Sequence, residues 1–358
     1  MRIVMTLIVH NEEDILDANL VYHFAQGVHH VLAIDDRSTD ATGSILDRHA
    51  RGGRLTRIAR PEGEMYAAQS RWLTLLARRA ATEHQADWVI NNDADEFWWP
   101  LRGTLVDAFA TVPGDCGVVV APRTDFIIGD ESQDGRVERI TLREATSPIS
   151  AKVAHRGSPH VVVGTGSHHA LTDPTLDELA WSGKEDREYD LRASPVFPIR
   201  VFHFPVRRWA FVEPPAGGAP PALARDPVLN RMRRSPEHSA VDASALPGRR
   251  AEAIAEHVRQ GAIVEDRRLA AFLAREGLVE GSQPPAETAS VDPPRPDDEA
   301  TEVMRLVVDA LLSENHYLRG RRQRLKGQVE SLASNRWLQM GRAVGNLRRT
   351  GRARRKVR

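Results

Sequence analysis

The residue types best suited to chemistry stand together in the segment Asn91–Phe97, which reads NNDADEF. Asp93 and Asp95 are two residues apart, so on an extended chain their carboxylates point to the same side and can face one cation. Carboxylates of this kind suit Mg²⁺ or Mn²⁺, which complete their coordination shells with water and phosphate oxygens. Acidic turns are common on protein surfaces, but this one leaves a predicted strand, where open α/β sheets bind their ligands. The segment therefore predicts a divalent-cation site.

Polar side chains also follow two earlier apolar strand patterns, at residues 2–9 and 28–35. They are Asn11, Glu12, Glu13, Asp35 and Asp36. Such groups can accept hydrogen bonds from the base and ribose of a nucleotide, although acids here also favour a helix N-terminus and both roles can coexist. For the segment Ser38–Asp40 we expect helix capping rather than ligand binding.

Strands and helices alternate through the first hundred residues and must position these groups. The patterns predict strands at 2–9, 28–35, 55–59 and 88–91. Between them lie a helix at 12–26, a loop and helix within 36–50, and a helix at 65–81. Strands separated by helices favour parallel βαβ units with right-handed crossovers.

After Pro100 the strand patterns have no long helices between them. They lie at 117–122, 136–143, 160–164 and 199–204, and short helical patterns follow at 251–261 and 266–276. The sequence therefore predicts an α/β fold whose sheet is mixed and partly antiparallel.

The composition is that of an ordinary soluble protein: 41% of its 358 residues are hydrophobic and 27% are charged. No apolar run approaches the ~20 residues needed to span a bilayer, and the first residues do not resemble a secretory signal. The single cysteine, Cys116, excludes an internal disulfide framework and a Cys-rich zinc site. We expect a reducing, cytoplasmic location.

The formal net charge of zero conceals an acidic body and a basic tail. Residues 319–358 contain 14 Lys and Arg and a single acid, Glu330. Leu311, Leu318, Leu325 and Leu332 recur every seven residues, which predicts a homodimeric coiled coil through residues 304–332. The arginine-rich residues 336–358 fit an interfacial helix on an anionic membrane, at the inner face of the cell membrane. Nucleic acid ranks lower as a partner because no recognition fold accompanies the tail.

In order along the chain, IVHNEED, HFAQGVHHVLAIDDRSTDAT and WVINNDADEFW resemble the family 2-like glycosyltransferases of the GT-A fold, and more narrowly a branch with a D-x-D-E-F segment. The later segments GSHHA (166–170), RVFHFPVRRWAF (200–211) and RQGAIVEDRRLAAFL (259–273) resemble that branch too. The resemblance covers residues 1–275. It implies a Rossmann-like mixed sheet and transfer of a sugar from a nucleotide-diphosphate donor to a hydroxyl acceptor on a glycan, lipid or other carrier, with inversion of the anomeric centre.

The resemblance also implies roles for individual residues. For the nucleotide-sugar donor these are Asn11, Glu12, Asp35, Asp36, Gln69, Arg71 and Asp93. For the cation, Mn²⁺ or Mg²⁺, they are Asp93, Asp95 and His203, with Asp95 as the direct ligand. Together with the composition and the heptad pattern, it predicts four parts: a catalytic domain (1–213), a Pro-rich break with a small helical acceptor-side extension (214–280), a disordered linker (281–300) and the coiled-coil and basic tail (301–358).

The general base is the least defined residue. Glu185 and Asp186 are candidates from order alone, since they follow the D-x-D segment and precede His203, but a charged surface loop explains them equally well. Asp125 and Asp130 are alternatives. The residues after His203 depart from the branch because a lysine is missing before the Pro-rich break, which affects the acceptor side.

Four more histidines, His155, His160, His168 and His169, fit no zinc-binding spacing. We expect them on strand faces, with His168 as the one candidate for contact with metal or donor.

Two other function classes remain open at this stage. A nucleotidyltransferase would carry a Gly-rich basic phosphate loop near its start, where this chain has His10–Asp14. A catalytically degenerate sugar-nucleotide-binding or scaffold protein would act through its coiled-coil tail. Metal-dependent hydrolysis of a supplied nucleotide sugar separates these classes from a glycosyltransferase.

Overall fold

The computed structural model describes residues 1–62, 65–112, 114, 116–145, 151–172, 199–208, 228 and 246–278. The chain divides into two units, Met1–Val307 and Val308–Arg358, and the description concerns the first. Several predictions lie outside the described residues: the base candidates Glu185 and Asp186, the Pro-rich break, the linker, the coiled coil and the basic tail. Within the described part of the chain, no helix combines the length and the apolarity needed to cross a bilayer.

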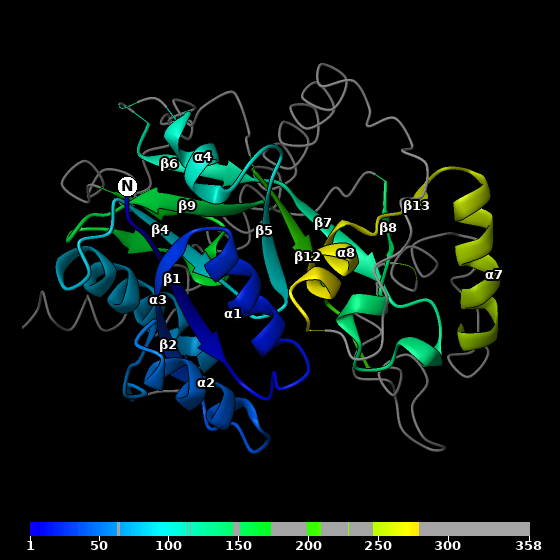
Figure 1. The fold of residues 1–358 in the computed structure, drawn as a ribbon, viewed down its shortest axis with the longest axis horizontal. Coiled ribbons are helices and arrows are strands. Elements are labelled where there is room, and N and C mark those ends of the chain that lie inside the picture. The colour runs from blue at the N-terminus through cyan, green and yellow to red at the C-terminus, as the bar shows by residue number, and fades with distance from the viewer. Residues whose placement is uncertain are drawn as a thin grey trace, which may run out of the picture. The chain divides into compact units, whose positions relative to one another are not determined.

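The first half of the chain contains the strands of a six-stranded sheet (Figure 1), whose strand order is β3-β2-β1-β4-β9-β6. Its strands are β1 (Ile3–Val9), β2 (Val28–Asp35), β3 (Leu55–Arg57), β4 (Trp88–Asn92), β6 (Val118–Ala121) and β9 (Lys152–Arg156). Strand β1 runs parallel to β2 and β4, whereas β9 is antiparallel to β4 and β6. Every residue of β1 is buried, as its unbroken apolar run predicts.

Helices cover both faces of this sheet and create two hydrophobic cores. They are α1 (Leu16–Ala25), α2 (Thr42–Arg51), α3 (Met65–Thr82) and α4 (Leu105–Ala110). Side chains of β1 alternate between the cores: Met5 and Leu7 pack with α1, α2 and α4, while Val4 and Ile8 pack with α3. The predicted βαβ arrangement is confirmed.

A second sheet has the strand order β13-β8-β7-β12-β5. Its strands are β5 (Glu96–Pro100), β7 (Arg123–Ile127), β8 (Leu142–Glu144), β12 (Ile199–His203) and β13 (Ile263–Glu265). Strand β12 lies between β5, to which it is antiparallel, and β7, to which it is parallel. Helices α7 (Leu246–Arg259) and α8 (Arg268–Arg275) belong to the same region, and α8 packs on α1 through Phe272 and Tyr22. A turn of three residues joins β4 to β5, so the acidic segment links the two sheets.

A two-stranded ribbon, β10 (Val162–Val163) and β11 (Ala170–Leu171), and three 3₁₀ turns complete the described elements. The turns are η1 (Glu131–Gln133), η2 (Val137–Arg139) and η3 (Thr165–Ser167).

Several local predictions were wrong or too long, among them the strand expected at 55–59, since β3 ends at Arg57. Residues 136–143 form the turn η2 followed by the start of β8 instead of one strand, and of residues 160–164 only Val162 and Val163 are strand. Helix α1 begins at Leu16, because residues 12–15 form a turn in which Glu12 O accepts the N–H groups of Ile15 and Leu16. The N-cap residue of α2 is Ala41, outside the predicted Ser38–Asp40, although the Asp40 carboxylate accepts the N–H of Thr42 at 2.9 Å.

Candidate active site at the junction of the two sheets

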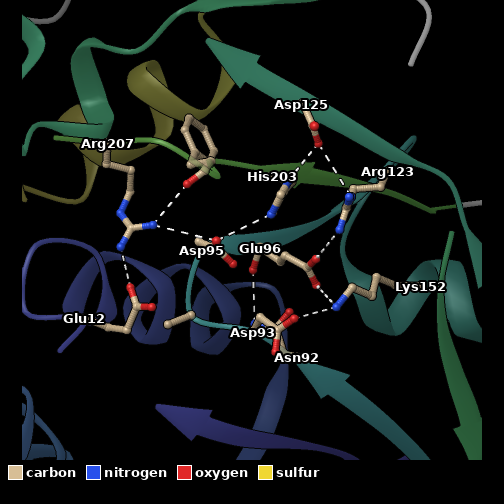
Figure 2. Close-up of polar contacts among 12 residues, drawn as sticks. Glu12, Asn92, Asp93, Asp95, Glu96, Arg123, Asp125, Lys152, His203 and Arg207 are labelled. Atoms are coloured by element: carbon tan, nitrogen blue, oxygen red, sulfur yellow. Dashed lines mark hydrogen bonds and ion pairs between the residues drawn. The ribbon is translucent and has the colours of Figure 1, made fainter. Parts of the chain in front are cut away.

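The acidic turn Asp93–Asp95 stands where the two sheets meet (Figure 2). The parallel pairing of β1 with β2 and β4 brings the carboxyl ends of these strands to one edge of the first sheet. Residues that follow β1, β2 and β4 therefore gather at this edge, as ligand-binding residues do in open α/β sheets.

A neutral hydrogen-bond network beneath the turn holds its backbone. The amide of Asn19, on α1, donates to Ala94 O at 2.9 Å and to Glu96 O at 2.7 Å. The amide of Asn92 donates to Glu96 O at 3.1 Å and to Asn19 Oδ1 at 3.3 Å. The two carbonyls flank Asp95 in the chain, so the network fixes the backbone from which the Asp95 side chain projects.

His23 and Trp98 extend this network below the turn. His23 Nδ1 lies 2.8 Å from Asn19 O, and His23 Nε2 accepts the backbone N–H of Trp98 at 3.2 Å. The indole N–H of Trp98 donates to Asn92 Oδ1 at 3.0 Å. Burial lowers the pKa of His23 to about 4, so the ring is neutral, with its proton on Nδ1.

Above the turn, three side chains form a group suited to a divalent cation. One ligand atom from each of Asp95, Glu96 and His203 lies within 4.8 Å of the other two. The antiparallel pairing of β5 with β12 sets His203 opposite Glu96. Two carboxylates and an imidazole fit Mn²⁺, and the carboxylates fit Mg²⁺.

Asp125 orients the imidazole of His203. Its Oδ1 lies 2.7 Å from His203 Nδ1, which leaves Nε2 facing Asp95 Oδ2 at 3.4 Å. Although burial opposes it, the charges of Asp125 and Asp95 raise the pKa of His203 to about 9. Burial likewise opposes ionisation of Asp95, yet His203 and Arg207 hold the pKa of that carboxyl well below its usual range. Without a cation the pair is an imidazolium and a carboxylate, and a cation bound there would take the place of the Nε2 proton.

Asp93 lies outside this three-residue group, although the sequence predicted it as both a cation ligand and a donor-binding residue. Its Oδ2 accepts a hydrogen bond from Lys152 Nζ at 2.6 Å. The same ammonium group is 3.1 Å from Glu96 Oε2, and Arg123 is 3.6 Å from Glu96 Oε1 on the other side. Asp93 is therefore already paired with a cation supplied by the chain.

Arg207 joins the turn to the loop after β1. Its guanidinium forms an ion pair with Glu12. It also lies 3.0 Å from Asp14 Oδ2 and 3.7 Å from Asp95 Oδ2. Burial raises the pKa of Glu12 to about 8, opposed by Arg207 and assisted by Asp95. Glu12 thus stands next to the acidic turn, and its proton relieves part of the negative charge gathered there.

The acids after β2 lie at the same edge but have partners of their own. Asp36 is buried and pairs with Arg60, and Arg57 lies 3.2 Å from Asp35 Oδ2. Asn11 adopts a left-handed backbone conformation (φ 54°), and its side-chain carbonyl accepts the N–H of Thr39 at 2.8 Å. Such strained backbone is frequent at ligand-binding loops.

The two donor-binding residues predicted on α3, Gln69 and Arg71, lie in different surroundings. Gln69 Oε1 accepts the N–H of Gly166 at 3.1 Å and thereby ties α3 to the turn η3, whereas Arg71 is exposed to solvent. His168 follows η3, and its Nδ1 contacts Ala151 O at 2.9 Å. Burial and the nearby Lys152 lower the pKa of His168 to about 4. His168 is thus near the site and neutral.

Three more histidines occupy other positions. His155 is buried on the strand β9, His169 is half-buried, and His160 is exposed.

Sequence reasoning assigned no role to Lys152, Glu96, Arg123 or Arg207, and gave Asp125 only as an alternative base. Glu96 lay inside the NNDADEF segment and could have been included for that reason. Lys152 showed a fainter signal, a lysine at the start of the short strand segment KVAHR that forms β9.

The mixed sheet with an acidic turn at its carboxyl edge has the architecture expected of the GT-A class. Residues 6–170, which include this turn, match the model of the family described as glycosyl transferase family 2. This match confirms, over these residues, the resemblance to family 2 glycosyltransferases expected from the sequence, and the expected α/β fold with a mixed sheet is confirmed as well. No curated protein matches the chain.

Several solved structures resemble part of the chain. S. aureus TarS in complex with UDP-GlcNAc is 16% identical, with 57% of this chain and 56% of that chain covered and a TM-score of 0.31. TarS in complex with UDP is 14% identical, with 44% and 47% covered and a TM-score of 0.29. Glucosyl-3-phosphoglycerate synthase from Mycobacterium tuberculosis, in complex with Mn²⁺, UDP and phosphoglyceric acid, is 19% identical, with 43% and 55% covered and a TM-score of 0.25. The chain spans about half the length of these structures, and the family model matches residues 6–170.

Proposed function

We propose that the protein transfers a sugar from a nucleotide-diphosphate donor to a hydroxyl acceptor, that it depends on Mn²⁺ or Mg²⁺, and that it inverts the anomeric centre. The observation that carries the proposal is the group formed by Asp95, Glu96 and His203 inside a family 2 domain. It offers oxygen and nitrogen ligands at the sheet edge where a donor would bind.

Asp95 and His203 are the residues that would hold the cation, and the fully buried Glu96 is the third member of the group. A divalent cation there would stabilise the negative charge that develops on the departing diphosphate. Asp125 keeps the Nδ1 proton on His203 and so presents Nε2 to the site, a common arrangement for metal-binding histidines. Because Asp125 is buried and committed to His203, orientation of the imidazole explains it better than the role of general base.

The nucleoside would lie against the loops after β1 and β2. Asn11, Glu12, Asp35 and Asp36 line this edge, and Arg207 holds Glu12 toward the acidic turn. Asp93, whose side chain is 36% exposed, would face the donor between these loops and the cation group.

The general base stays a proposal from sequence order, with Glu185 and Asp186 as candidates outside the described residues. Asp130 is a weaker alternative, since its Oδ1 already accepts the backbone N–H of Ser132 at 2.9 Å. A carboxylate within hydrogen-bond reach of the acceptor hydroxyl would take its proton during attack on the anomeric carbon.

The test combines binding and turnover. Thermal shift and calorimetry with UDP and GDP, each with and without Mn²⁺, should show binding that requires the metal. A supplied nucleotide sugar should then be hydrolysed slowly in a metal-dependent way, since water can replace the missing acceptor. Binding without any hydrolysis would favour a degenerate sugar-nucleotide-binding protein. Release of pyrophosphate from a nucleoside triphosphate and a sugar phosphate would favour a nucleotidyltransferase.

A further inference from the structure

Lys152 is a buried lysine at the base of the candidate site. It is the first residue of β9, and its side chain is 1% exposed. In the register of β4 with β9, Ile90 lies opposite Ala154, which brings Lys152 level with Asn92, directly before the acidic turn. Lysine is rarely buried unless it is paired, and this position therefore requires an explanation.

The ammonium group of Lys152 is fixed between two acids that face different parts of the site. It donates to Asp93 Oδ2 at 2.6 Å and lies 3.1 Å from Glu96 Oε2 (Figure 2). Asp93 is the more exposed partner and faces the proposed donor, whereas Glu96 is fully buried and belongs to the cation group. One positive charge is thus shared between the donor side and the cation side of the turn.

Glu96 has no hydrogen bond to either carboxylate oxygen among the residues that the structure describes. Burial raises the pKa of Glu96, and the nearby ammonium of Lys152 and the more distant Arg123 oppose that shift. Burial works against the charged form of Lys152, but Asp93 and Glu96 raise the pKa of its ammonium group above the ordinary value. Lys152 therefore remains charged at neutral pH.

The charged groups around Lys152 nearly balance before any ligand binds. The groups labelled in Figure 2 include the carboxyl groups of Glu12, Asp93, Asp95, Glu96 and Asp125, of which Glu12 holds a proton at neutral pH, and the cations Lys152, Arg123 and Arg207 together with the imidazolium of His203. A divalent cation that approaches Asp95 and Glu96 is repelled by Lys152, whereas a nucleoside diphosphate, with about three negative charges, is attracted by Lys152.

We propose that Lys152 is a built-in second cation of the donor site, which weakens binding of the bare divalent ion and strengthens binding of the nucleoside diphosphate that arrives with it. Lys152 is a positioning residue in this scheme: it holds Asp93 and Glu96 and adds a fixed positive charge next to the diphosphate. The inference rests on the proposed function and adds to it a preference for binding metal and donor together.

The test is calorimetry on the full chain with the variants Lys152→Gln and Lys152→Arg. The probes are Mn²⁺ alone, then UDP and GDP at saturating Mn²⁺. Lys152→Gln keeps a hydrogen-bond donor for Asp93 but removes the charge. We expect it to bind Mn²⁺ several-fold more tightly and the nucleotide about tenfold more weakly, in line with the loss of one charge-assisted interaction. Lys152→Arg should restore both affinities to within a few-fold of wild type.

A matched control comes from the second sheet. Arg143 forms a partly buried ion pair with Asp266, 2.8 Å away, so Arg143→Gln also removes one positive charge from a paired position. It should leave both affinities unchanged, which separates a local effect of Lys152 from an effect of net charge. Near-UV circular dichroism of each variant identifies those that fold, and if Lys152→Gln does not, Lys152→Met is measured in its place.

The outcomes separate the two proposals. Wild-type protein that binds neither Mn²⁺ nor a nucleotide would overturn the proposed function, and the role of Lys152 with it. Wild-type binding with no change in the Lys152 variant, or with both affinities moving in the same direction, would overturn the role of Lys152 alone. Opposite movement of the two affinities is a result that simple structural damage would not produce.

Discussion

Two buried polar networks meet at the acidic turn. One consists of neutral, hydrogen-bonded groups, and the other consists of ionisable side chains. Below the turn, Asn19, His23 and Asn92 are neutral and exchange hydrogen bonds with one another and with the backbone of β5. Above it, Asp95 and His203 are charged, burial raises the pKa of Glu96, and the oxygens of Glu96 accept no hydrogen bond from any described residue.

The difference indicates a division of labour. A satisfied neutral network rigidifies the backbone that it holds, and it needs no ligand to complete it. A charged group with unmet hydrogen-bonding capacity and displaced pKa values is expected at a functional site. Changes below the turn should therefore act first on stability, and changes above it first on metal binding and turnover.

The largest effect is expected for Asp95→Ala. Removing the proposed direct cation ligand should lower kcat/KM by about 10³-fold or more, on the scale of losing a principal electrostatic contact in a transition state. The free energy of unfolding should also fall, because Asp95 is an ion-pair partner of His203 and Arg207, but the variant should still fold. Turnover of a nucleotide sugar together with chemical denaturation measures both, and an Asp95→Ala protein with wild-type turnover would contradict the site assignment.

The second prediction addresses the network below the turn. Asn19→Leu keeps the volume of the side chain but removes the donor of Ala94 O, one of the two donors of Glu96 O, and an acceptor of the Asn92 amide, all in a buried place. The free energy of unfolding should fall by about 2–4 kcal/mol, the cost of one orphaned buried acceptor together with the further hydrogen bonds lost. Urea denaturation checks this, and a stable Asn19→Leu protein that has lost all turnover would break the comparison.

The third prediction concerns the pH dependence of metal binding. Since His203 has a raised pKa of about 9, a cation must displace its proton at lower pH, and Mn²⁺ affinity should rise by up to tenfold per pH unit toward pH 9. In linkage terms, the raised pKa means that the ion pair with Asp95 and Asp125 stabilises the metal-free fold fully below the unfolded value of about 6.5. That stability is lost as pH rises through about 9. Calorimetry between pH 6 and pH 9 should show a flatter profile for His203→Ala, and identical profiles would remove His203 from the site.

The smallest effect is expected for acid stability below the turn. The pKa of His23 is lowered to about 4, so protons bind the unfolded chain first as pH falls below about 6.5. By linkage, the protonation of His23 in the unfolded chain should lower the free energy of unfolding by about 1 kcal/mol at pH 5.5 relative to pH 7.5. His23→Gln should show a smaller loss over this interval in urea denaturation. An equal loss in both proteins would assign the acid sensitivity to other groups.

Much of the first half could be predicted because its signals are local. An unbroken apolar run followed by acids defines both a buried strand and the residues at its end, and Asp93 and Asp95 were placed at the sheet edge on that basis. The strand expected at 136–143 failed because Val137 and Ile140 are three residues apart, a spacing that suits a helical turn better than a strand.

The partners within the site could not be predicted from local patterns. Lys152 pairs with an acid 59 residues earlier, and Arg207 pairs with Glu12 across 195 residues. Neither contact leaves a periodic signal, since each depends on how the sheets join. His203 was found only through the resemblance to a family, and the role of Asp125 became visible only once β7 was seen beside β12.

The position of β12 between β5 and β7 has a consequence for the protein as it is being made. The acidic turn leaves the ribosome directly after the parallel strands of the first sheet, but His203 is 108 residues after Asp95. At ~5–20 residues per second, its synthesis follows on the order of 5–20 seconds later. During that interval the nascent chain exposes an acidic turn without its histidine and with an unfilled place in the second sheet, between β5 and β7. Nascent chains of increasing length, assayed for metal binding, should therefore gain it in one step when residue 203 has cleared the exit tunnel.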